Sequence, residues 1–93
     1  MITATMKNWS LGAKRRECVA PENPTPLLFG EIFGDAKGRF PDGASIRSSR
    51  IMGITNCGDY KVVETLNSSY AIYPNDIDLE YESTFPDAYK RLQ

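Results

Sequence analysis

Four carboxylates at alternate positions are the feature of this chain most able to bind something: Asp76, Asp78, Glu80 and Glu82. The apolar residues between them predict a β-strand with one acidic and one apolar face. Neighbouring acids on such a strand lie about 6.6 Å apart, where water reduces their repulsion to about 0.6 kcal/mol per pair. The row therefore needs no metal ion. It fits a solvated edge that resists aggregation, a docking surface for a basic partner, or a cation site.

The four acids and the tyrosines beside them, Tyr73 and Tyr81, together form a predicted protein-interaction surface. Exposed aromatic residues inside a rim of charge are typical of protein interfaces. The cation site is disfavoured, because the spacing lacks the glycine and the terminal glutamate of a calcium-binding loop. We predict no metal site.

Arginines form a second candidate surface, for nucleic acid: Arg15, Arg16, Arg47 and Arg50. Small barrels bind single strands with arginines and stacking aromatic rings, here Trp9, Phe40 or Tyr60. The acidic isoelectric point, about 5.3, counts against broad phosphate binding. A third alternative is self-association, in which the basic N-terminal residues of one copy meet the acidic row of another.

Catalytic groups are scarce. The chain has no histidine, the most common general acid or base, and no phosphate-binding glycine motif. We expect neither enzymatic activity nor a cofactor. The two cysteines, Cys18 and Cys57, have no nearby partner in sequence and are interpreted as small buried apolar residues. Whether they ever pair is left open.

Tight turns divide the middle of the chain into strands. Asp42-Gly43, Cys57-Gly58-Asp59 and Asn67-Ser68 occupy positions where hairpins tolerate positive φ. They predict strands over residues 27–33, 44–56, 60–66 and 69–73, in addition to a short strand near 7–11. The strand over 44–56 is expected to bend near Ser48-Ser49, where its alternation slips. Gly30 predicts a close backbone approach or a bulge.

The remaining segments complete a single domain over residues 1–93. Three prolines predict a loop over 20–26. A short C-terminal helix is predicted over 84–92, with Thr84 and Asp87 at capping-box spacing. Five to six short strands fit a mainly β, small antiparallel barrel, SH3-like or OB-like, which removes exposed sheet edges.

A cytoplasmic location is expected for this chain of 93 residues. No apolar run approaches the roughly 20 residues that span a bilayer. The first residues lack the basic start and apolar centre of a signal peptide.

The stretch 38–73 resembles a group of small phage, prophage and plasmid proteins. The resemblance lies in Phe40, Asp42-Gly43, Ile46 and Ser48-Ser49, followed by a strand with Thr65, Ser68 and Tyr70. It implies an accessory product of a mobile element that binds a host protein and interferes with a defence or regulatory complex. From residues and resemblance together, we expect a non-catalytic binding protein.

Overall fold

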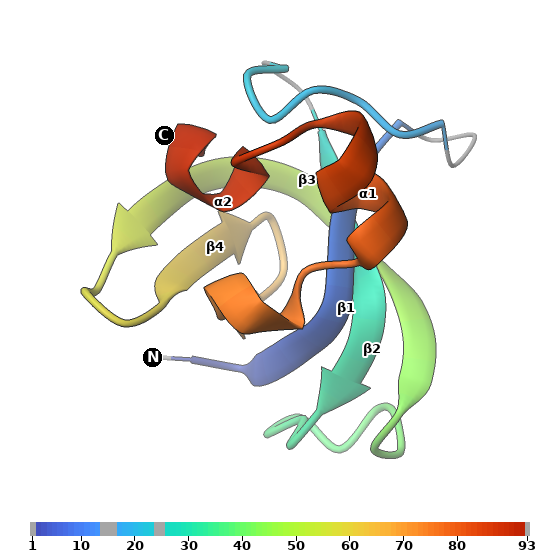
Figure 1. Cartoon of the computed structure of the whole chain (residues 1–93). Helices are drawn as coiled ribbons and strands as arrows, with labels where there is room; N and C mark the ends of the chain where they lie inside the picture. The colour runs from blue at the N-terminus through green and yellow to red at the C-terminus, as the bar shows by residue number, and fades with distance from the viewer. Residues whose placement is uncertain (1, 14–16, 24–25, 93) are drawn as a thin grey trace.

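Five strands follow one another around a closed ring in the computed structural model, which describes residues 2–13, 17–23 and 26–92 (Figure 1). The strands are β1 (Ala4–Gly12), β2 (Leu27–Phe33), β3 (Ala44–Asn56), β4 (Lys61–Thr65) and β5 (Ser69–Ile72). Consecutive strands pair antiparallel, and a parallel β1–β5 pair closes the barrel. The predicted mainly β barrel is confirmed. Its sequential strand order differs from the Greek-key order of an OB-fold.

The bend predicted in β3 is present, and it lets one strand join two others. The first half pairs with β2 as far as Arg50, opposite Leu27. The second half pairs with β4 from Ile51, opposite Thr65. At the bend the buried Ser48 hydroxyl accepts a hydrogen bond from Leu28 N (2.9 Å) and donates one to Ser49 O (2.7 Å). A side chain thus satisfies backbone groups where the ladder is interrupted.

The close approach predicted at Gly30 is confirmed. A Cβ atom there would lie 2.8 Å from the carbonyl oxygen of Lys7 and 3.2 Å from Trp9 Cα. On the opposite strand the β1–β2 register shifts between Lys7 and Ser10, where Asn8 takes a φ of 50°. The absence of a side chain on Gly30 therefore lets β1 bulge towards β2.

The predicted positive φ is present in the turns at Gly43 and Gly58 and absent from the β4–β5 turn. Gly43 has a φ of 88°, which glycine tolerates. The β4–β5 turn does not use positive φ, since Asn8 and Asp87 are the only non-glycine residues in the described ranges that have it. Instead, Thr65 Oγ1 accepts from Ser68 N (3.1 Å) and donates to Ser68 O (2.8 Å).

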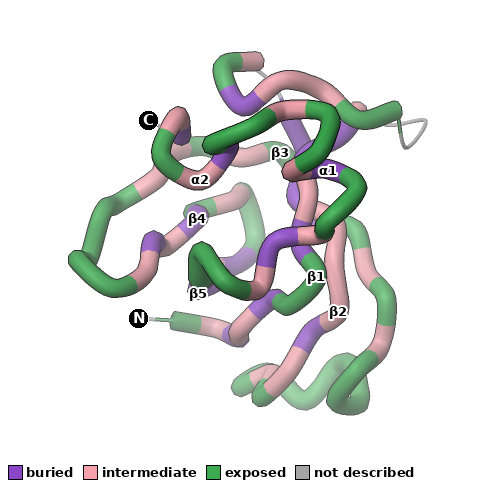
Figure 2. Tube along the Cα trace, in the orientation of Figure 1, coloured by how far each residue is buried: buried purple, intermediate pink, exposed green. Residues whose placement is uncertain are grey.

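Buried residues lie on the strands and on the C-terminal segment, as Figure 2 shows, and they form one core cluster. Trp9 is fully buried at its centre. Its ring centroid lies 6.5 Å from that of Tyr81 and 6.2 Å from that of Tyr89. These aromatic contacts join the last quarter of the chain to β1.

The acidic strand predicted over 76–82 is wrong, because most of this segment is helical and only Ile77 makes a strand-like contact, an isolated bridge with Trp9. Pro74–Asp76 forms the 3-10 turn η1, and α1 runs over Leu79–Thr84. Asp78 caps α1 by accepting from Glu80 N and Tyr81 N. Ile77 and Tyr81 are both buried, so the inward spacing is i, i+4 and not the i, i+2 of a strand.

The predicted helix over 84–92 is likewise wrong in its bounds. α2 covers only Ala88–Arg91, and Thr84 is the last residue of α1. Asp87 has a φ of 61° and makes no side-chain cap. Its backbone N donates to Glu82 Oε2 (2.7 Å), so the chain turns sharply between two short helices. In Figure 1 this orange-to-red segment crosses the ring.

Candidate interaction surfaces

The acidic segment, which we define as residues 76–82, presents an exposed apolar side chain with acidic residues on both sides of it in sequence. Leu79 is 82 % exposed, the highest exposure among the large apolar residues described. Glu80 beside it is exposed, and Asp76, Asp78 and Glu82 are partly so. An isolated exposed leucine is ordinary, but one inside a rim of a single charge has the composition of a small binding surface.

The two tyrosines predicted beside the acids have separate positions. Tyr73 is 38 % exposed, and its ring centroid lies 5.4 Å from that of Tyr60. Tyr81 is only 1 % exposed, so its assignment to an exposed surface is wrong. Its hydroxyl donates to Val19 O at 2.6 Å, and burial raises its pKa above the ordinary range. Tyr81 therefore positions α1 and is not available to a partner.

Backbone and side-chain contacts from the barrel hold the acidic segment in place. Asp78 N donates to Trp9 O (2.8 Å), and Trp9 Nε1 donates to Tyr73 O (2.9 Å). Trp9 thus fixes the chain on both sides of η1. These bonds are buried or half-buried, where hydrogen bonds direct conformation most strongly.

A buried lysine holds the C-terminal helix α2, which follows the acidic segment. Lys61 Nζ donates to Tyr89 O (2.5 Å) and Leu92 O (3.2 Å), and it lies 4.5 Å from the centre of the Tyr89 ring. Desolvation lowers the pKa of Lys61. The ammonium group satisfies carbonyls at the end of α2, where positive charge is favourable.

The predicted arginine cluster is brought together only in part. Arg15 and Arg16 lie outside the described residues. Arg47 and Arg50 are exposed on β3, and they line a hollow of about 570 Å³, which we call the arginine hollow. Its other lining residues are Leu27, Ser48, Ser49 and Leu66. Leu66, which is 60 % exposed, was not predicted as part of a surface, although its position between a strand end and a turn was an available signal.

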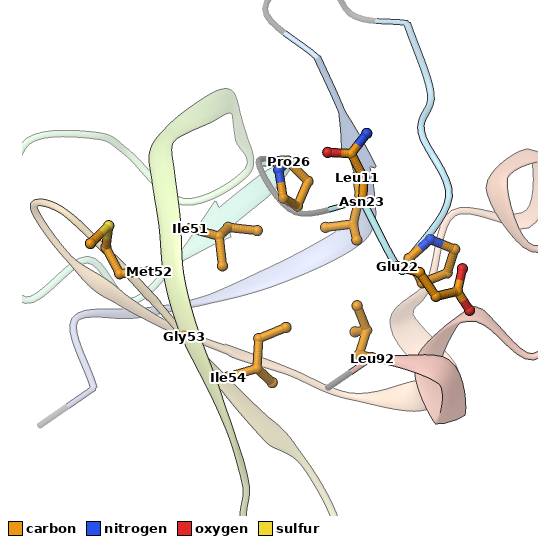
Figure 3. A pocket seen from close by; sticks show the side chains of 10 residues that line it. Leu11, Glu22, Asn23, Pro26, Ile51, Met52, Gly53, Ile54 and Leu92 are labelled. Atoms are coloured by element: carbon orange, nitrogen blue, oxygen red, sulfur yellow. The ribbon is translucent and has the colours of Figure 1, made fainter.

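A smaller hollow of about 230 Å³ lies where β3, β1 and the chain end meet. Figure 3 shows Ile51 and Ile54 pointing towards Leu92, with Met52 on the other side of β3. Leu11 and Leu92 in its lining are core residues. We therefore assign this hollow to packing between elements.

A polar network joins the β2–β3 loop to the turn that carries Leu66. Asp35 accepts from the backbone N of Lys37 (3.1 Å), Arg39 (2.9 Å) and Phe40 (3.2 Å). Lys37 Nζ donates to Asn67 O and Ser68 Oγ, and Arg39 donates to Ser68 Oγ at 3.2 Å. The loop thus supports the β4–β5 turn from one side.

The interpretation of the cysteines as buried residues is wrong, because Cys18 and Cys57 are both exposed and both are free thiols. Across the described ranges, no group of three or more histidine, cysteine, aspartate or glutamate side chains is arranged to hold a metal ion. Within the same ranges, no helix has the length and apolar character needed to cross a membrane.

Comparisons with models of protein families, with curated proteins and with solved structures find no match to this chain.

Proposed function

We propose that this protein is a non-catalytic binding protein that uses the acidic segment to capture a protein with a basic surface. The proposal depends mainly on one observation, the exposure of Leu79 in a sequence that carries four carboxylates, on a segment that the barrel holds in place. Burial of an apolar side chain favours binding, and the charges near it select a partner of opposite charge. The resemblance of residues 38–73 adds the proposed context, a mobile-element accessory factor acting on a host protein in the cytoplasm.

Rigid support is what makes the segment suitable for recognition. A loop that orders only when it binds loses conformational entropy at that moment, which weakens binding. Here Trp9 O and the Asp78 cap already fix the start of α1. Capture therefore requires little reorganisation of this surface.

The test compares two triple variants with the same loss of charge. Asp76→Asn, Glu80→Gln and Glu82→Gln remove charge from the acidic segment, and Asp78 is left because it caps α1. Glu17→Gln, Asp59→Asn and Glu64→Gln remove three exposed carboxylates elsewhere. With each protein immobilised in lysate of the host cell, we expect the first variant to lose the proteins that the wild type captures and the second to keep them. Equal capture by both variants contradicts the proposal.

Nucleic-acid binding is the second candidate, favoured by one observation: Arg47 and Arg50 line the same hollow. Arginines in a groove bind phosphates, with an affinity that falls steeply as salt rises. A gel-shift series with single-stranded DNA and RNA tests it. Absence of a complex even at low salt removes this candidate.

A further inference from the structure

The acidic segment and the arginine hollow have opposite charge and matching chemistry. Leu79 projects from the first, with Asp78 and Glu80 beside it. The second has the buried Leu27 and Ser48 within its lining and the exposed Arg47 and Arg50 among its other residues. No acidic residue is among the described residues that line this hollow. The one surface thus offers an apolar side chain with negative neighbours, and the other receives such a group among positive ones.

We propose that these two surfaces bind each other between copies of this chain, with Leu79 of one copy entering the arginine hollow of the next. The hollow has a volume of about 570 Å³ and is open to solvent, so a side chain of another copy can enter it from outside. The carboxylates of Asp78 and Glu80 then lie near the guanidinium groups of Arg47 and Arg50.

Different elements carry the two surfaces. α1 is bonded to β1 through Asp78 and Trp9, whereas the hollow belongs to β3, the start of β2 and the residue after β4. Leu79 is 82 % exposed within its own chain and is therefore not in its own hollow. The formal net charge of −1 produces little repulsion between copies.

The contact is head-to-tail, because each copy contributes a different surface to it. Such heterologous contacts form rings if the rotation closes and open chains if it does not. The proposal does not depend on the partner proposed above, since it concerns a second copy of the chain. It does place both events on the acidic segment, so self-association and partner capture compete.

Sedimentation velocity of the wild type is the first measurement. At an ionic strength of about 0.01 M, where screening extends over about 30 Å, the sedimentation coefficient should rise with concentration over roughly 10 µM to 1 mM, the range in which weak contacts form. At about 1 M salt, where screening extends over about 3 Å, association should be much weaker. A monomer throughout the low-salt series overturns the proposal.

Complementary variants then test the head-to-tail arrangement. Leu79→Ser breaks the acidic surface, and Arg47→Glu with Arg50→Glu breaks the hollow. Each variant alone should associate at least about tenfold more weakly than the wild type, a loss of about 1.4 kcal/mol. Their mixture retains one intact hollow and one intact acidic segment, so it should form a 1:1 dimer that does not grow further.

The oligomeric state of this mixture supports or overturns the head-to-tail contact. Recovery of a 1:1 dimer supports the proposal, and a mixture that stays monomeric overturns it. Wild-type association by either variant alone also overturns it. If the double arginine variant has an altered circular-dichroism spectrum, Leu66→Ser replaces it, because Leu66 lines the same hollow and is 60 % exposed.

Discussion

Leu79 and Leu66 are the two most exposed leucines in the described part of the chain, and their surroundings are opposite. Leu79 belongs to α1 and has acidic neighbours in sequence, while Leu66 follows β4 and lines a hollow with Arg47 and Arg50. The first stands on a segment held by side chains of the core. The second stands on a turn between two paired strands. The same residue type is thus exposed in two different settings, a short helix anchored to the core and a turn between paired strands.

Trp9→Ala should have the largest effect on the acidic segment, because Trp9 supports this segment from inside the barrel. The change removes a fully buried ring that contacts Tyr81 and Tyr89. We expect the free energy of unfolding to fall by about 3–5 kcal/mol, as for other large core aromatics. Urea denaturation followed by circular dichroism measures it. The control Trp9→Phe should cost clearly less, and equal losses would show that ring packing is not the cause.

Asp78→Ala tests the acidic segment alone. The carboxylate accepts from Glu80 N (2.8 Å), and its loss leaves the first turn of α1 without a cap. We expect about 1 kcal/mol lower stability and faster amide hydrogen exchange in α1, with exchange around Leu66 unchanged. Asp78→Asn is the matched control, since asparagine caps nearly as well. A helix that exchanges equally in both variants would refute the assignment of the cap.

Acid titration tests the region around Leu66, through the loop that supports the neighbouring β4–β5 turn. Desolvation acts to raise the pKa of Asp35, but the N–H groups of Lys37 and Arg39 and the Arg39 side chain lower it overall. Because the pKa of Asp35 is lower in the folded state, its charge stabilises the protein at pH values above the ordinary aspartate pKa of about 3.9. This stabilisation is lost as pH falls through the folded value.

The expected result is that wild-type protein loses more of its melting temperature between neutral and strongly acidic pH than Asp35→Asn does. Asp59→Asn, on the exposed β3–β4 turn, should follow the wild type. Parallel melting curves of the wild type and Asp35→Asn would mean that Asp35 does not stabilise the loop through its charge.

The strands of the middle region could be predicted from local sequence alone. β2 and β3 have the predicted bounds, because the turn around Asp42-Gly43 and the glycines that precede it delimit them. The bend in β3 was predictable from the slip in alternation at Ser48-Ser49. Turn type and side-chain alternation both depend on residues that are close in sequence.

The acidic segment could not be predicted in the same way. Its alternation of acids and apolar residues matches a strand, but Ile77 and Tyr81 also match one face of a helix. The choice between them depends on Trp9, far away in sequence, whose carbonyl accepts from Asp78 N and whose ring packs against Tyr81. Tertiary contacts of this kind override local propensity. The exposure of Leu79 and the burial of Tyr81 both follow from the helix forming in place of a strand. Neither could therefore be predicted from the sequence.

The most direct test of the proposed binding function replaces each of the two leucines in turn. Leu79→Ser and Leu66→Ser remove similar apolar side chains from exposed positions, so neither should lower the free energy of unfolding by more than about 0.5 kcal/mol. Capture of host-cell proteins is then quantified by mass spectrometry for both variants and the wild type. We predict that Leu79→Ser loses the captured proteins and that Leu66→Ser keeps them. Full capture by Leu79→Ser would contradict the assignment of the acidic segment as the binding surface.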